Sequence, residues 1–294
     1  MGRVDRYITC TNGDGVSVDF GEVALSPFLL VDADGVYQVQ NNVTISENTM
    51  SDGGAYQGSV AKVRNIVLYL KDITNHVYNR NLLDALFKSG QPGTLVFHEE
   101  ENTRQCSYYV ESVNSSGQYG ARTYTVSLLC PDPFFYAMSD VTVYMSAWIA
   151  GFEFVHEFTA IGEEFGYRSS ERLQKIINEN ASDGIGMDIR IYANGDVENP
   201  SIIHVERDEK ITIGTASKPM NMVAGDTIRI TTSDNDKHVY LTHEGVEEEV
   251  NEYLTEDSVF IQLMRGSNSI GYDAESGVDN MVVSLTYRLK YQSA

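Results

Sequence analysis

Two prolines that bracket one aspartate, Pro131-Asp132-Pro133, constrain the fold of this chain more than any other stretch. Each proline fixes its own φ angle, has no N–H group to give to a β-ladder, and pushes the residue before it towards extended geometry. Residues 122–129 just upstream alternate β-branched and aromatic side chains, which is a strand pattern. A strand that stops at Pro131 and is followed by three aromatic residues predicts the end of one domain and a linker anchored by rings.

The position of this stretch near the middle of 294 residues indicates two domains, since each half is long enough for a core of its own. An ordinary proline turn inside a single domain is the alternative. We predict a first domain over residues 1–137 and a second over residues 138–294. The predicted hinge between them consists of Pro131, Asp132, Pro133, Phe134, Phe135 and Tyr136.

The first half of the sequence predicts a small β domain. Residues 16–20 and 43–46 alternate in the manner of strands, and residues 64–70 give the strongest strand pattern of this half. Residues 51–59 are polar and rich in glycine, so we expect them to form a surface loop.

One helix is expected in this half, between residues 79 and 90. Its apolar stripe consists of Leu82, Leu83, Leu86 and Phe87, which share one face at helical spacing. Asn79 is the candidate N-cap and Gly90 the candidate C-cap. Pro92 then ends the helix, because proline cannot continue the backbone hydrogen bonds.

Short strands separated by Gly, Asn and Asp turns fill the second half, at the spacing typical of a β-sandwich. Examples are residues 189–192, 227–232, 259–263 and 281–291. Residues 172–178 fit a helix as well as a strand, because their leucine and isoleucines suit either spacing. We favour a strand, because residues 179–186 then form a hairpin connection.

The strongly acidic composition restricts the possible partners. The chain has 21 Lys and Arg residues against 42 Asp and Glu residues, a formal net charge of −21. Proteins that hold nucleic acid by its phosphates need clustered basic residues, so this charge disfavours DNA binding but suits a surface past which DNA slides. No apolar run approaches the ~20 residues that span a bilayer, and we expect no membrane partner.

Side chains that could carry chemistry do not form a complete motif. Residues 59–62 and 233–235 match the Ser-x-x-Lys and Ser-Asp-Asn elements of serine β-lactamases, but the Lys-Thr-Gly element is absent. His238 and His243 are the one pair of histidines close enough along the chain to suggest a metal site. We predict no catalytic residue, no cofactor and no metal ion, and therefore a protein that is not an enzyme.

The three cysteines are Cys10, Cys106 and Cys130, an odd number without the spacing of a metal site. In a protein made in the cytosol we expect reduced, half-buried thiols, with a structural disulfide as the less favoured alternative.

Several motifs together resemble the distal tail proteins of siphophages, the Dit family. In the second half the resemblance covers residues 191–200, 224–232, 253–263, 266–270 and 283–291. In the first half it covers residues 27–30, 64–68, 82–87 and 93–95 and the close of the domain at Pro131-Asp132-Pro133. Each motif is weak by itself, being turn chemistry and strand alternation, but their order and spacing are specific.

The resemblance implies a mainly β fold, with an N-terminal split β-barrel-like domain that has one helix, followed by a C-terminal galectin-like β-sandwich. It also implies a structural hub of the baseplate of a non-contractile tail. In that family six copies form a ring at the tail tip, and the expected partners are the other five copies, the tail tube protein, the tail-associated protein and receptor-binding proteins. DNA would pass through the ring without specific binding, in a virion assembled in the cytoplasm of the bacterial host.

A free-standing carbohydrate-binding β-sandwich is the alternative function. The chain is rich in tyrosine, with 18 residues of this type, and tyrosine rings can stack on sugars. Such a module would be monomeric, whereas a hub would form a ring of six copies.

Overall fold

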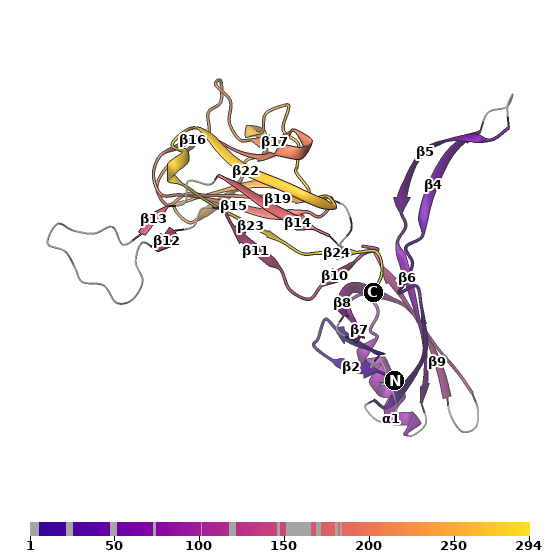
Figure 1. Cartoon of the computed structure of the whole chain (residues 1–294). Helices are drawn as coiled ribbons and strands as arrows, with labels where there is room; N and C mark the ends of the chain where they lie inside the picture. Colours follow the sequence, from indigo (N-terminus) through magenta and orange to yellow (C-terminus); the bar gives the residue numbers. More distant parts are fainter. Residues whose placement is uncertain are drawn as a thin grey trace. The chain divides into compact units, whose positions relative to one another are not determined.

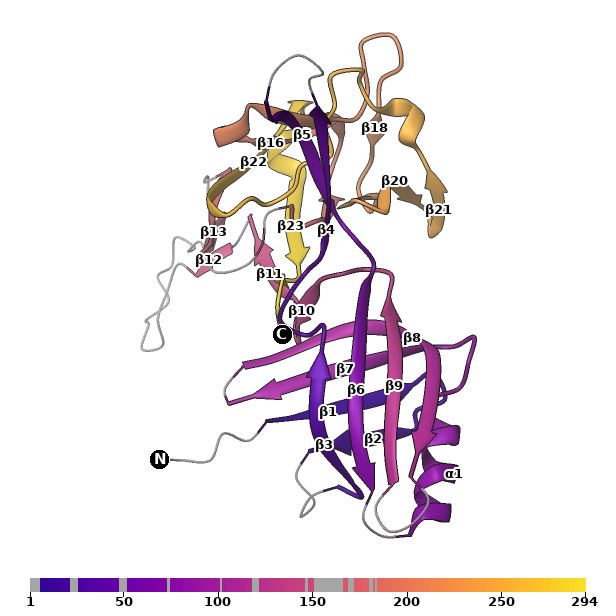
Figure 2. The same cartoon turned by 90° about the vertical axis from the view of Figure 1, so that its right-hand side faces the viewer.

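The computed structural model describes residues 6–21, 26–47, 52–72, 75–100, 102–117, 122–145, 148–150, 166–168, 172–179, 182 and 184–294. The chain forms two compact units (Figures 1 and 2). Unit 1 comprises residues 1–138 and 290–294, and unit 2 comprises residues 139–289. Residues 290–294, which the sequence analysis assigned to the second domain, thus lie in unit 1. The described residues contain no helix with the length and apolar character needed to cross a membrane.

Unit 1 is built around one antiparallel sheet that curls on itself. In spatial order its main strands are β2 (Ser17–Phe20), β1 (Arg6–Asn12), β7 (Pro92–Glu99), β8 (Asn102–Ser116), β9 (Arg122–Cys130), β6 (Arg64–Asp72) and β3 (Phe28–Asp34). Among the described residues, the two ends of this order are joined by an isolated bridge between Gly21 and Leu29 and by no continuous ladder. The sheet is therefore an open barrel, and the prediction of a mainly β fold is confirmed.

The core of unit 1 follows from the alternation of its strands. In β6, Ile66, Leu68 and Leu70 point inward and are fully or almost fully buried. Helix α1 (His76–Leu86) adds Leu83 and Leu86 to this core, as its apolar stripe predicts. The helix is thus confirmed, and the burial of one side chain in two along each strand explains why the strand pattern was readable.

The start of the helix differs from the prediction. Asn75, with a left-handed φ of 55°, is the N-cap, so the helix begins at His76 and Asn79 lies inside it, where it is buried. At the other end Phe87 is the C-cap, and Gly90 lies beyond it with a φ of 80°. Lys88 forms an ion pair with Asp14 at 2.6 Å. The two residues expected to cap the helix, Asn79 and Gly90, therefore do not cap it.

Residues expected to form a loop are instead half of a two-stranded sheet. Strand β4 (Asn41–Glu47) pairs with β5 (Gly54–Ala61), with an irregularity in register between Thr44 and Ile45. The loop prediction was therefore wrong for residues 54–59, whereas residues 52 and 53 lie outside the strand and residue 51 lies outside the described residues. Neither face of this hairpin is buried, so polar and small residues are tolerated in β5 and no apolar alternation reveals it.

Unit 2 is a β-sandwich of a six-stranded and a five-stranded sheet, whose layers are visible in Figure 1. The first sheet has the order β11 (Val141–Tyr144), β23 (Met281–Tyr287), β15 (Met187–Ala193), β19 (Thr227–Ser233), β20 (Asp236–His243) and β21 (Val246–Glu249). The second has the order β14 (Leu173–Asn178), β22 (Gly266–Ser276), β16 (Val197–His204) and β17 (Glu209–Thr212), with β18 (Asn221–Met222) beside β16.

Other elements of unit 2 are short. They are β12 (Trp148–Ala150) paired with β13 (Gly166–Arg168), and the 3-10 turns η1 (Val205–Arg207), η2 (Asn251–Tyr253) and η3 (Val278–Asn280). The ambiguous residues 172–178 form strand β14, as favoured. Residues 259–263 do not form a strand, because their backbone hydrogen bonds go singly to Lys210 and Ile185 and build no continuous ladder.

Candidate functional site

The two most exposed large apolar side chains among the described residues of unit 1, Val60 and Tyr56, belong to the β4–β5 hairpin. The exposed fractions are 54% for Val43, 57% for Ile45, 67% for Tyr56 and 71% for Val60. Ile45 and Tyr56 lie directly opposite each other in the ladder, and Val43 shares their face two residues along β4. Val60 pairs with Asn42 and therefore lies on the other face. Exposed apolar side chains that cluster on one face are a candidate interaction site.

The backbone of the hairpin is equally open. Among the residues that the structure describes, β4 and β5 pair only with each other, so each has a free edge. Figure 2 shows the hairpin extending beyond the end of β6, clear of the curled sheet of unit 1. A two-stranded sheet with no core beneath it is at best marginally stable in water, and free edges readily pair with another chain. We call β4–β5 the hairpin surface.

The predicted hinge residues lie together at a corner of unit 1. Strand β9 ends at Cys130, and the short strand β10 (Phe135–Ala137) begins after the two prolines. Both strands pair with the same long strand, β8, so the prolines interrupt one ladder. The division between the units falls after Met138, beyond these residues.

Hydrogen bonds stabilise this corner, residues 131–136, which we call the proline corner. The Asp132 carboxylate accepts the backbone N–H of Phe134 at 3.1 Å and the Tyr136 hydroxyl at 2.5 Å. The carbonyl oxygen of Pro133 accepts Nε–H of Arg64 at 2.6 Å. The Arg64 guanidinium also lies over the ring of Phe135, which is fully buried, at 4.8 Å. These contacts show why an aspartate stands between the prolines and why aromatic residues follow.

Arg64 also holds the returning end of the chain. Its side chain is 4% exposed and donates to the carbonyl oxygens of Gly35 at 2.5 Å, Val36 at 3.2 Å and Gln292 at 2.5 Å. Charged donors make hydrogen bonds about twice as strong as neutral ones. Arg64 therefore joins three segments of unit 1: the end of β3, the proline corner and the C-terminal residues.

Residues 290–294 make further contacts within unit 1. Strand β24 (Lys290–Tyr291) pairs with β10, as Figure 1 shows. Arg104 donates to the carbonyl oxygen of Ser293 at 2.7 Å and lies 3.8 Å from the centre of the Tyr291 ring. The backbone N–H of Ala294 donates to Val36 at 3.0 Å. The chain thus crosses between the units twice, once in each direction. We call residues 290–294 the C-terminal tail.

Removal of the C-terminal tail is expected to destabilise unit 1 by about 3–5 kcal/mol, because two buried or stacked arginines lose charge-assisted hydrogen bonds. In calorimetry the transition of unit 1 should fall by about 10 °C, while that of unit 2 stays unchanged. The matched control is Gln292→Ala, which keeps the backbone carbonyl that Arg64 uses and should melt as the native protein does. An unchanged unit 1 transition after truncation would contradict the role of the tail.

The β-lactamase-like motifs do not come together in the structure, and the two histidines that suggested a metal site do not face each other. Ser59 lies on the exposed strand β5 rather than at a helix start, and residues 233–235 belong to unit 2. His238 and His243 lie five residues apart on β20, hence on opposite faces. Each has its own carboxylate at 2.7 Å, Glu249 for His238 and Asp226 for His243. Within the described part of the chain, no three His, Cys, Asp or Glu side chains are placed to hold a metal ion.

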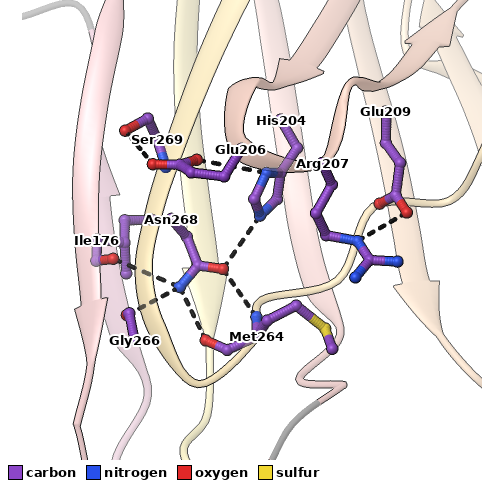
Figure 3. Close-up of polar contacts among 9 residues, drawn as sticks. All are labelled: Ile176, His204, Glu206, Arg207, Glu209, Met264, Gly266, Asn268 and Ser269. Carbon is purple, nitrogen blue, oxygen red and sulfur yellow. Dashed lines mark hydrogen bonds and ion pairs between the residues drawn. The ribbon is translucent and has the colours of Figure 1, made fainter.

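The most connected polar cluster of unit 2 is centred on the buried Asn268 of β22 (Figure 3). Its Nδ2 group donates to the carbonyl oxygens of Met264 at 2.8 Å and Gly266 at 3.2 Å, and its Oδ1 accepts the N–H of Met264 at 2.8 Å. Since Oδ1 is then the acceptor, Nε2 of His204 donates to it at 3.1 Å. Asn268 thus satisfies the backbone of the turn that precedes β22.

On the solvent side of this cluster, Glu206 binds the residue that follows Asn268. The Glu206 carboxylate accepts the Ser269 N–H at 2.7 Å and the Ser269 hydroxyl at 2.6 Å, and these bonds lower the pKa of Glu206. Its Oε2 lies 3.5 Å from Nδ1 of His204, which is buried. The contacts of Asn268, His204, Glu206 and Ser269 thus join β16 and its following turn to β22, while among the described residues Nδ1 of His204 has no hydrogen-bond partner and Arg207 pairs with Glu209 (Figure 3).

Comparison with known proteins gives matches in structure alone. No protein-family model matches the chain, and no curated protein is similar to it in sequence. The crystal structure of the Dit protein of phage SPP1, a hub of the adsorption apparatus in phages that infect Gram-positive bacteria, matches with a TM-score of 0.68. The two chains are 12% identical, and the match covers 97% of this chain and 99% of the SPP1 chain.

A second match is a chain of the baseplate of phage P2 in its activated conformation, with a TM-score of 0.50 and 13% identity over 99% of this chain and 100% of that chain. Both matches extend over unit 1 and unit 2, so the similarity is not confined to a common β-sandwich. The resemblance indicated by the sequence motifs is confirmed at the level of the fold. This chain has the fold of a phage Dit protein.

Proposed function

We propose that the chain is a structural hub of a phage tail baseplate. The observation that carries the proposal is the match to the SPP1 Dit hub over 97% of the chain, in both units. The two histidines considered for a metal site are each paired with a separate carboxylate, and the serine motifs lie in different units. The protein would work through its surfaces, as part of the virion at the tip of the tail.

The proposed assembly is a ring of six copies made by unit 1. The hairpin surface supports it, because its apolar side chains and free strand edges need a partner. A hairpin that reaches a different surface of the next copy makes a head-to-tail contact, and such contacts close into a ring when the rotation per copy is right. The tail tube protein would bind one face of this ring and the tail-associated protein the other.

Unit 2 would be the docking arm for receptor-binding components. It carries most of the charge: 11 Lys and Arg against 27 Asp and Glu residues, a net charge of −16, whereas unit 1 has 10 against 15, a net charge of −5. A unit 1 ring with this mild negative charge would let DNA pass through its channel without binding it. The larger charge on unit 2 favours partners with basic surfaces.

The test of the proposed function is the mass and shape of the purified protein. A chain of 32.7 kDa should appear at about six times this mass by light scattering, and as closed rings in electron micrographs. A monomer that binds glycans would instead support the carbohydrate-binding alternative. A monomer that forms no ring even with the tail tube protein would reject the hub.

The hairpin surface should be required for the ring but not for the fold. The double variant Ile45→Asp/Tyr56→Asp places two like charges opposite each other on the proposed contact, and we expect it to abolish the ring. Because both side chains are exposed in the monomer, the melting temperature of the monomer should change by less than about 2 °C. The measurement is light scattering together with calorimetry.

The control for this variant is Val77→Asp, which alters an apolar side chain of α1 that is 66% exposed and lies outside the hairpin. It should keep the ring. Rings that persist in the hairpin variant would show that the contacts between copies lie elsewhere on unit 1.

A further inference from the structure

Three thiols lie in the core of unit 1. Cys10 of β1, Cys106 of β8 and Cys130 at the end of β9 are free and buried, and they belong to one apolar cluster. They are more deeply buried than the half-buried thiols expected from the sequence. Buried structural thiols are usually inert, whereas a positive charge beside a thiol favours its reactive thiolate form. Cys106 and Cys130 have each other and the charge of Arg64 as neighbours.

Cys106 and Cys130 are in contact, with their Sγ atoms 3.9 Å apart. Cys106 and Cys130 lie on the neighbouring strands β8 and β9, and sulfur atoms this close can be joined by a disulfide when the side chains and local backbone shift. Cys10 pairs across the sheet with Leu95, and Leu95 pairs with Cys106. Cys10 is thus two strands from Cys106, about 9–10 Å away, and cannot bond to it without movement of the backbone. The thiols that are in contact are therefore Cys106 and Cys130.

The positive charge is supplied by Arg64, which lies directly opposite Cys130 in the β6–β9 ladder. The guanidinium is buried and its hydrogen bonds go to backbone carbonyl oxygens, which carry no net charge. A buried cation favours an anion beside it. The Asp132 carboxylate also acts on Arg64 and, together with burial, works against the thiolate form of Cys130. The hydrogen bond from the Cys106 thiol and the charge of Arg64 lower the pKa of Cys130, whereas burial raises that of Cys10.

We propose that Cys106 and Cys130 are a redox pair that closes to a disulfide on exposure to a peroxide, while Cys10 stays reduced. The Cys130 thiolate attacks one oxygen of hydrogen peroxide, the O–O bond breaks, and Cys130 becomes a sulfenic acid as hydroxide leaves. The Cys106 sulfur then attacks the Cys130 sulfur, the S–O bond breaks, and the second oxygen leaves as water after taking the Cys106 proton. Two thiols and one peroxide give one disulfide and two waters.

The disulfide would close a loop of 24 residues between β8 and the end of β9, next to Pro131. Closure of such a loop limits the unfolded chain and stabilises the folded one. It would also fasten the proline corner to β8 by a covalent bond. Thiols stay reduced in the cytosol and are oxidised outside it, so the bond would form only after the protein leaves the reducing compartment. This inference does not depend on the proposed function.

The experiment uses the full chain, first reduced and then treated with hydrogen peroxide, with free thiols counted by alkylation in denaturant and mass spectrometry. The reduced protein should give three alkylated cysteines and the oxidised protein one, with a peptide that links Cys106 to Cys130. Its unit 1 transition should rise in calorimetry, and dithiothreitol should reverse both changes.

Single substitutions separate the roles of the three residues. Cys10→Ser should still form the link, whereas Cys130→Ser should not. Cys106→Ser should stop at the sulfenic acid of Cys130, which dimedone traps. Arg64→Met should slow oxidation, and Arg104→Met is its control, since Arg104 also binds the C-terminal tail and does not pair with Cys130. Three alkylated thiols after peroxide, or a link through Cys10, would overturn the proposal.

Discussion

The variant Leu86→Asp is expected to leave unit 1 unfolded while unit 2 stays folded. Leu86 is fully buried in the core of unit 1, on the stripe of α1 that packs against the sheet. Loss of the leucine packing costs about 3 kcal/mol, and a carboxylate buried there without a partner costs several kcal/mol more. The sum is comparable with the whole stability of a domain, about 5–15 kcal/mol.

Calorimetry of the full chain measures this effect. The native protein should show transitions for both units, and Leu86→Asp should lack that of unit 1. Val77→Asp lies on the exposed side of the same helix and should melt as the native protein does. A unit 1 transition that survives Leu86→Asp at its native temperature would mean that α1 does not pack as described.

Residues 139–289 are expected to fold by themselves as a soluble monomer. Both sheets of the sandwich are made from this range, and it has its own core, which includes Ile189, Ile202, Ile228, Ile270 and Leu285. About 150 residues are ample for one core. The C-terminal tail is left out of the fragment because its contacts are with unit 1. Circular dichroism and calorimetry should show the cooperative melting of a folded β protein.

The complementary protein is unit 1 with unit 2 excised. Because β10 and β24 are antiparallel neighbours, a short glycine linker can join Met138 to Lys290 in a hairpin. This protein should fold and keep the tendency to form rings, since the hairpin surface belongs to it. An unfolded sandwich fragment, or rings formed by the sandwich alone, would reverse the assignment of the two units.

The sequence predicts most readily those elements of this fold that bury one face, although residues 43–46 of β4 were also predicted and have no buried face. In β6 and β9 one side chain in two is buried, so strict alternation made both strands readable. The same rule explains the failure at β5, where both faces are exposed and no alternation is needed. It also explains the error at residues 259–263, where apolar residues are spaced as in a strand but the hydrogen bonds form no ladder.

The candidate site was only partly predictable. The proline corner was found because proline acts on its own neighbours, whereas the C-terminal tail was missed because its contact with Arg64 joins residues 228 positions apart. The burial of Arg64 could have been predicted from the sequence. Arg64 is separated by an even number of residues from Ile66, Leu68 and Leu70 of the same strand, so all four side chains point to the same, inward face. A charged group buried there requires partners.

The double crossing of the chain fixes the order in which the units can be completed during synthesis. The ribosome releases residues 1–138 first, yet β10 has no β24 to pair with, and the Gln292 acceptor of Arg64 does not yet exist. Unit 2 can form as soon as residue 289 has emerged, because it needs nothing that follows. Domains usually fold in the order in which they are made. In this chain the unit that is begun first is finished last.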